Sequence, residues 1–92
     1  MIMDKKQFAD FCADLESGRI RVAEKVDGNW KVNAWIKEAI LEGFKLGTLT
    51  DMTEGQFPFI DKDTIPVRKF TVGDKVRIVP GGSSVRRGAY LA

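Results

Sequence analysis

Hydrophobic residues recur at helical spacing near the start of the chain. Asp4 precedes them as a helix cap, and Gln7 stands three residues later, where it completes a capping-box pattern. One face of the predicted helix is apolar and consists of Phe8, Phe11, Cys12 and Leu15. Ser17 and Gly18 end the pattern. The sequence therefore predicts an amphipathic helix in which Cys12 is buried. We interpret Cys12 as a structural cysteine and not a reactive one, because no basic residue stands beside it within the helix to activate its thiol.

The next stretch, "RIRVAEKVDGNWKV" (residues 19–32), alternates apolar and polar positions as a β-hairpin does. Ile20 and Val22 alternate on the first strand, and Trp30 and Val32 alternate on the second. Asp27-Gly28 between them supplies the positive φ angles that a tight primed turn needs. This hairpin is the clearest structural prediction that the sequence allows.

A second helical pattern follows in "AWIKEAILEGFKL", with Asn33 as its cap and Gly47 after its last residue. Its wide apolar face consists of Trp35, Ile36, Ala39, Ile40 and Phe44. We interpret this aromatic stripe as core, and we expect Trp30 and Trp35 together to cover the hairpin against this helix.

The hydrophobic pattern weakens over residues 48–64, which predicts a surface loop with at most one short strand. The four acids of this loop lack the ordered spacing of a calcium site, so we expect no metal site there. After Pro66, "VRKF" and "KVRIV" predict two short strands joined by a turn at Gly73-Asp74.

A period of six residues marks the last segment. Val79, Val85 and Leu91 hold its first position, and the small residues Ser83 and Ala89 hold its fifth. This is the pattern of a left-handed parallel β-helix, in which one coil cannot bury its own apolar face.

Taken together, these patterns predict an α+β fold. Residues 1–78 form a cap of two helices, a hairpin and short strands, and residues 79–92 begin a β-helix that continues in a longer protein or is tied down by another copy of the chain.

Composition narrows the possible functions. The 92 residues include no histidine and a single cysteine, Cys12, so the usual His-based acid–base and nucleophile pairs and the usual zinc sites are excluded. A lone cysteine fits a reducing, cytoplasmic location. Apolar runs are too short to span a membrane, and the first ten residues do not form a secretory signal. We do not expect a complete enzyme within these residues.

Positive charge is concentrated near the end of the chain. From Ile65 onward there are six basic residues and one acid, which indicates an anionic partner. Nucleic acid ranks last among such partners, because no nucleic-acid motif is present and the aromatic residues stand at core spacing.

Two blocks of sequence together resemble one known family. "LESGRIRVAEKVDGNWKVNAWIKEAIL" and "VRIVPGGSSVRRGAYLA" are similar, in order, to the N-terminal part of tetrahydrodipicolinate N-succinyltransferase. The shared features are the hairpin with its Asp-Gly turn and Trp, the Asn-x-Trp start of the helix, and the Arg-x-Val-Pro and Val-Arg-x-Gly-Ala runs. Residues 48–70 match poorly, and the region before the hairpin is shorter than in the family.

The resemblance implies an acyltransferase of the diaminopimelate and lysine pathway, which moves succinyl from succinyl-CoA to a dicarboxylate amine. Members are homotrimers with an N-terminal cap, a left-handed β-helix and active sites between subunits. Their catalytic acids lie in the β-helix, so the resemblance places no catalytic residue, metal or bound cofactor within residues 1–92.

The resemblance also implies one substrate-binding residue. Arg77, in "VRIVP", matches the family arginine that grips a substrate carboxylate, a task that suits its planar guanidinium. The alternative for Arg77 is an exposed strand residue between Val76 and Ile78. Arg86 and Arg87 are weaker candidates for contacts to CoA phosphates or a neighbouring subunit, with plain solvation as the alternative. The alternative function for the whole chain is a non-catalytic module that self-associates through its hairpin and tail.

Overall fold

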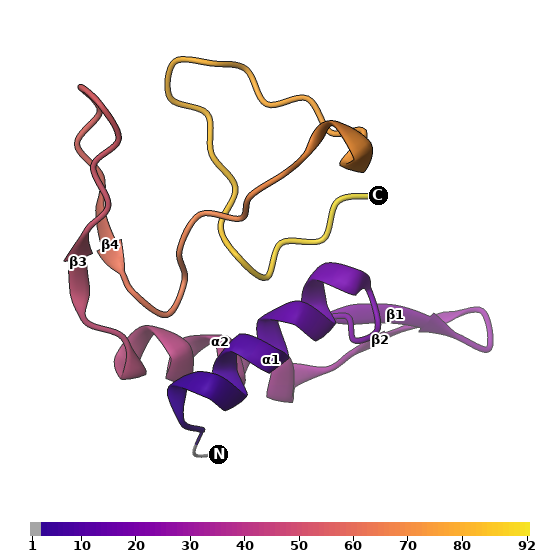
Figure 1. The fold of residues 1–92 in the computed structure, drawn as a ribbon. Coiled ribbons are helices and arrows are strands. Elements are labelled where there is room, and N and C mark those ends of the chain that lie inside the picture. Colours follow the sequence, from indigo (N-terminus) through magenta and orange to yellow (C-terminus); the bar gives the residue numbers. More distant parts are fainter. Residues whose placement is uncertain (1–2) are drawn as a thin grey trace.

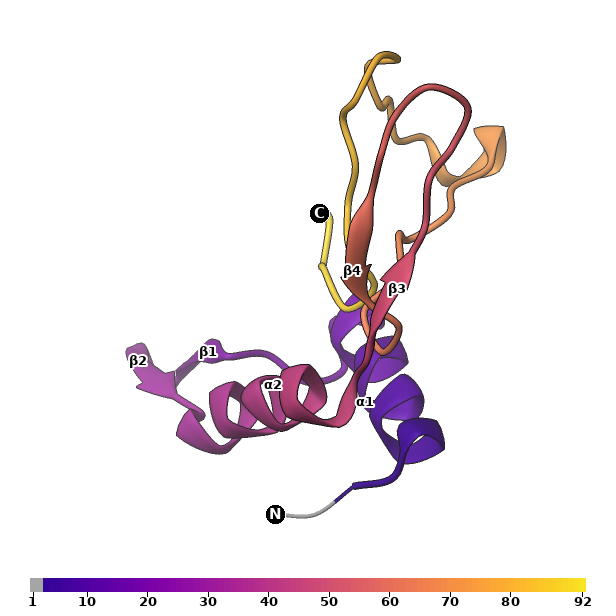
Figure 2. The same ribbon diagram turned by 90° about the vertical axis from the view of Figure 1, so that its left-hand side faces the viewer.

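A computed structural model describes residues 3–92 as a pair of packed helices from which two antiparallel hairpins and a long irregular segment extend (Figure 1). The elements follow the order α1 (Lys5–Ser17), β1 (Ala23–Val26), β2 (Asn29–Val32), α2 (Ala34–Leu46), β3 (Leu49–Asp51), β4 (Ile60–Lys62) and a short 3-10 turn, η1 (Val72–Asp74). The β1–β2 and β3–β4 hairpins leave the helix pair in different directions, as the two views show (Figure 1; Figure 2). The α+β class predicted from the sequence is confirmed.

The start and end of α1 are those that the sequence predicts. Asp4 Oδ1 accepts a hydrogen bond from the Gln7 amide at 2.7 Å, and Gln7 Oε1 accepts one from the Asp4 amide at 2.9 Å, which completes the capping box. Gly18 ends the helix in the left-handed region, with φ of 78°. Both termini of α1 are therefore encoded locally.

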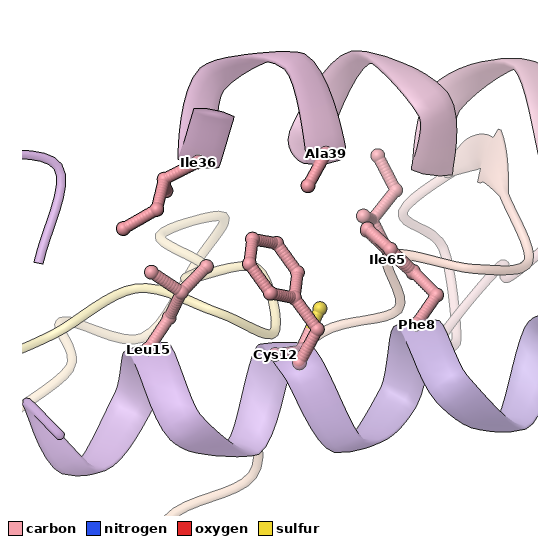
Figure 3. Close-up of a cluster of buried hydrophobic side chains, with 7 residues drawn as sticks. Phe8, Cys12, Leu15, Ile36, Ala39 and Ile65 are labelled. Carbon is pink, nitrogen blue, oxygen red and sulfur yellow. The ribbon is translucent and has the colours of Figure 1, made fainter. Parts of the chain in front are cut away.

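The core lies between the facing sides of α1 and α2 (Figure 3). Phe8 and Ile36 are fully buried, and the other buried apolar residues are Phe11, Cys12, Leu15, Ala39 and Ile65. All except Ile65 come from the two helices, and Ile65 reaches the cluster from the segment after β4. The predicted apolar face of α1 is confirmed in full, whereas α2 buries Ile36 and Ala39 and leaves Trp35 44% exposed.

The β1–β2 hairpin has the predicted turn but is shorter than the alternating pattern. Asp27 and Gly28 have φ angles of 51° and 80°, as a primed turn requires, and Val26 pairs with Asn29. The first strand begins only at Ala23, because the amides of Arg19 and Ile20 still bond to the Asp14 carbonyl at the end of α1. Residues 19 and 20 are thus part of the helix exit, whereas the Val22 carbonyl accepts a hydrogen bond from the Asn33 amide at 2.7 Å at the base of the hairpin.

Trp30 does not cover the hairpin against α2, so that prediction is wrong. Its side chain is 72% exposed, and Lys25 Nζ lies 5.9 Å from its ring. Trp35 instead packs on Phe11, with ring centroids 6.0 Å apart. All residues of β1 and β2 are exposed, so neither face of this hairpin is covered within residues 3–92.

Asn33 begins α2, but its side chain does not cap the helix as predicted. Its amide nitrogen donates to the Arg21 carbonyl at 2.8 Å and to Glu24 Oε1 at 3.3 Å. The residue therefore fastens the end of the β1–β2 hairpin to the segment that enters it. Gly47 follows the last residue of α2 as predicted.

Residues 48–64 form a second hairpin, so the prediction of a loop with at most one strand is wrong. Asp51 pairs with Ile60, and hydrogen bonds between Met52 and Phe59 and between Glu54 and Phe57 extend the pairing toward the tip. Leu49 and Ile60 are more than 60% exposed. A hairpin without a buried face has no reason to alternate apolar and polar residues, which explains the missing signal.

The strands predicted at 67–70 and 75–79 are also wrong. Neither segment is a strand, and η1 lies between them at the predicted Gly73-Asp74 turn, where Asp74 Oδ2 accepts a hydrogen bond from the Thr71 amide at 2.7 Å. Among residues 3–92, this region pairs through an isolated bridge between Val67 and Arg86. Residues 79–92 contain no strand, with Val79 70% and Leu91 39% exposed. The β-helix start and the boundary at residue 78 stay predictions.

Candidate functional site

Residues 85–90, which we call the tail, lie beside residues 66–68 and pass over α1 (Figure 1). The Arg68 amide donates to the Val85 carbonyl at 2.6 Å, and the Arg87 amide donates to the Pro66 carbonyl at 2.8 Å. This two-bond bridge places three arginines, Arg68, Arg86 and Arg87, in one neighbourhood. Arg86 and Arg87, two of the three candidate arginines predicted from the sequence, thus lie beside Arg68.

Arg86 pairs with Asp61 of β4. The Arg86 Nη2 and Asp61 Oδ2 atoms are 2.8 Å apart, and Arg86 Nε donates to the same oxygen at 3.0 Å. The pKa of Asp61 is lowered, first by a hydrogen bond from the Lys62 amide and then by Arg86. The guanidinium also lies 5.6 Å from the Phe44 ring. Arg86 therefore ties the tail to β4 and α2.

Arg87 pairs with Glu16 at the end of α1. Arg87 Nε donates to Glu16 Oε1 at 2.5 Å, and the same oxygen accepts the Gly88 amide at 2.9 Å. The hydrogen bond to Glu16 raises the pKa of Arg87 above its ordinary value. Both candidate arginines of the tail are thus engaged within the chain, and neither is simply solvated.

Two further arginines hold the ends of this arrangement, and the sequence pattern gave no sign of either. Arg68 Nη1 donates to the Ala89 carbonyl at 2.7 Å, and its guanidinium lies 4.7 Å from the Phe70 ring. Arg21 stacks on Tyr90 at 4.2 Å. The roles of Glu16 and Asp61 could not be seen in the sequence either, because their partners lie 71 and 25 residues away along the chain.

Arg77 lies apart from this arrangement in sequence and structure, in the exposed segment between η1 and Gly81. Within residues 3–92 its side chain makes no hydrogen bond or ion pair. Val76 beside it is half-buried, whereas Ile78 is 37% exposed, so Arg77 does not stand on a strand with two inward neighbours. A free guanidinium of this kind is available to a carboxylate ligand.

A hollow of about 650 Å³ lies beside this segment, between the tip of the β3–β4 hairpin and the irregular chain after Pro66. Its apolar lining includes Phe57, Phe59, Phe70 and Ile78. Arg68 and Lys69 also line it, against one acid, Glu54. Its charge therefore suits an anionic ligand, and Ile78 makes it continuous with the segment that carries Arg77.

Cys12 faces the tail from α1 and is 3% exposed. Burial raises the pKa of its thiol, while Arg87 lowers it and Glu16 raises it to smaller extents. The thiol stays protonated at neutral pH, as expected of a structural cysteine. Within residues 3–92 no group of three or more acidic, cysteine or histidine side chains is placed to hold a metal ion, and neither helix is long and apolar enough to cross a membrane.

Comparison with known proteins finds a family that is similar to the helical part of the chain. Residues 3–46, from the start of α1's cap to the end of α2, match the family described as tetrahydrodipicolinate N-succinyltransferase N-terminal. The match includes the β1–β2 hairpin and most of the core.

Curated relatives extend the similarity beyond these residues. The chain is 40% identical over 90 residues to 2,3,4,5-tetrahydropyridine-2,6-dicarboxylate N-succinyltransferase of Aromatoleum aromaticum, which covers 90% of this chain and 32% of the relative. It is 42% identical over 84 residues to the protein of that name from Legionella pneumophila (strain Corby), covering 85% of this chain and 29% of the relative. The relative from Agrobacterium fabrum is 41% identical over 85 residues, with 85% and 30% covered.

The chain thus spans about a third of the length of these curated relatives. The resemblance predicted from the two sequence blocks is confirmed, because the similarity to these relatives extends across most of the chain. These matches show that residues 3–46 are similar to the N-terminal domain of tetrahydrodipicolinate N-succinyltransferase, and that the similarity to the curated relatives extends over most of the chain.

Proposed function

We propose that this chain is the N-terminal module of a cytoplasmic N-succinyltransferase, which moves succinyl from succinyl-CoA to tetrahydrodipicolinate in diaminopimelate and lysine biosynthesis. The observation that carries the proposal is the identity of about 40% to curated N-succinyltransferases over nine-tenths of this chain. In the proposal the module contributes substrate binding and subunit packing in a homotrimer, and a β-helix after residue 78 contributes the catalytic acids.

Arg77 is the residue that we assign to the substrate. Its guanidinium is exposed and free of protein partners within residues 3–92, and it stands next to a hollow whose lining is apolar and net cationic. A dicarboxylate needs a paired, charge-assisted contact of the kind that a guanidinium fork provides. Arg86 and Arg87 are engaged with Asp61 and Glu16, which favours a role in holding the tail over contacts to CoA phosphates.

A chimera tests the proposal. Residues 1–92 replace the matching segment of the Legionella pneumophila relative, and CoA release from succinyl-CoA is measured with and without tetrahydrodipicolinate. We expect dicarboxylate-dependent turnover by the chimera and none by the relative with that segment deleted. A chimera that assembles like the intact relative but has no more activity than the deletion variant would contradict the proposal.

Self-association is a second candidate function, favoured by the uncovered β1–β2 hairpin. Trp30 and Val32 on β2 are 72% and 69% exposed, and a single two-stranded hairpin is marginally stable by itself. We expect the mass from sedimentation to rise with concentration, and Trp30→Ser to lower it. Leu41→Ser, at a half-exposed position on α2, is the matched control. A chain that stays monomeric at every concentration would exclude this function.

A further inference from the structure

We propose that Glu16 is a positioning residue, whose carboxylate fixes the course of the tail (residues 85–90) on α1. The proposal goes beyond the proposed function and does not depend on it, since it concerns how this chain holds its own tail. It assigns a purpose to an acid of α1 that contacts two residues of the tail.

One carboxylate oxygen receives donors from two consecutive tail residues. Arg87 Nε and the Gly88 amide both donate to Glu16 Oε1, at 2.5 and 2.9 Å. One donor is a side chain and the other is backbone, so the two contacts fix both the position and the orientation of the chain at this point. The Glu16 side chain is only 15% exposed, which places the contact away from bulk water.

A backbone bridge and a second ion pair also hold the tail, beside the Arg68–Ala89 hydrogen bond and the Arg21–Tyr90 stack. The bonds of Arg68 and Arg87 to Val85 and Pro66 form an isolated bridge outside any sheet. The Arg86–Asp61 pair is more exposed, with side-chain exposures of 55% and 29%, and exposed ion pairs contribute little. Glu16 therefore provides the least exposed charged contact between the tail and the helices.

The groups around Glu16 carry a net positive charge. Arg87 faces it from the tail, Arg68 from the segment after Pro66, and the thiol of Cys12 from its own helix. Lys69 and Asp74 line the adjoining hollow of about 510 Å³. Desolvation raises the pKa of Glu16, but the hydrogen bonds from Arg87 and Gly88 and the charges of Arg87 and Arg68 outweigh it, so the pKa is lower than usual. The carboxylate is therefore charged at neutral pH.

Backbone amide exchange measured by NMR on this chain tests the proposal. Glu16→Gln keeps an acceptor of the same shape and removes the charge. We expect exchange of the Gly88 amide to accelerate about tenfold or more, because a hydrogen bond to a charged group is lost from the closed state. The amides of Arg87 and Arg68 should accelerate with it, because their bonds to Pro66 and Val85 depend on where the tail lies. The matched control is Glu38→Gln, on the exposed face of α2.

Three further measurements make the outcome decisive. Arg87→Gln leaves α1 unchanged and should accelerate the same three amides, which covers the case in which Glu16→Gln does not fold. The amide of Ile36 should stay protected in every folded variant. Wild-type protection at Gly88 should fall as the pH drops below the usual glutamate range, and this fall should be smaller in Glu16→Gln, in which Asp61 still titrates but residue 16 does not. Acceleration confined to Gly88, or wild-type protection in both variants, would overturn the proposal.

Discussion

The ring of Phe8 on α1 lies directly against Gly43 on α2. A Cβ atom added to Gly43 would stand 2.0 Å from Phe8 Cζ and 2.2 Å from Phe8 Cε1. Phe8 is 1% exposed and belongs to the cluster of buried core residues. The two helices therefore approach each other at a position where only glycine fits.

Gly43→Ala should destabilise the chain, although alanine is normally the better helix former by about 1 kcal/mol. Overpacking a filled core costs about 1–3 kcal/mol, and the overlap at Phe8 is severe enough to reverse the sign. Thermal unfolding by circular dichroism should show a lower Tm. Gly73→Ala is the control, because a Cβ there meets only Thr71 Oγ1 at an ordinary 3.6 Å. An unchanged or raised Tm for Gly43→Ala would mean that the helices pack differently.

Asp4→Ala should remove the capping box of α1. The loss of a side-chain acceptor at this position costs about 1 kcal/mol, within a usual range of about 0.5–2 kcal/mol. Urea denaturation should show a lower midpoint with an unchanged slope. Asp10→Ala, in the exposed middle of the same helix, should have a much smaller effect. Equal effects of the two substitutions would show that the cap contributes no stability.

Acidification should weaken the fold. Glu16, Asp51, Asp61 and Asp63 all have pKa values below their ordinary ones in the folded chain. Carboxyls of this kind bind protons more readily when unfolded, so their contribution is complete above the ordinary pKa of about 4 and is lost as the pH falls through the lower folded values. The urea midpoint should therefore be lower at pH 3 than at pH 7. A midpoint that rises on acidification would contradict these contacts.

Arg77 should matter for substrate affinity in the chimera with the Legionella pneumophila relative. Arg77→Ala removes the guanidinium fork, and loss of a charged hydrogen bond of about 1.5–3 kcal/mol corresponds to about a tenfold to hundredfold fall in kcat/KM for the dicarboxylate. Arg77→Lys keeps the charge and should recover only part of it. The KM for succinyl-CoA should not change in either variant. Full activity of Arg77→Ala would remove this residue from the substrate site.

The helices and the first turn could be predicted because their signals are local. Asp4 and Gln7 are three residues apart, the buried residues of α1 recur at one helical period, and Asp27-Gly28 sits between its own two strands. Each of these features depends on neighbours in sequence, and tertiary packing did not override any of them.

The second hairpin and the contacts of the tail could not be predicted, for two physical reasons. β3 and β4 have no covered face, so nothing imposes alternation on Leu49 or Ile60. The partners of Glu16 and Asp61 are brought to them only by the complete fold, and a single acid on a helix is compatible with any partner or none. Trp30 was misplaced because alternation shows that a strand has two faces without showing which of them is covered.

Among the residues that the structure describes, Ile65 is the one buried core residue that is supplied from beyond α2. The helix pair can therefore stay folded by its own hydrophobic contacts while everything after residue 65 detaches. Melting of this chain should accordingly proceed in two stages of unequal cooperativity, in which the irregular C-terminal quarter is released first and the helices separate at a higher temperature.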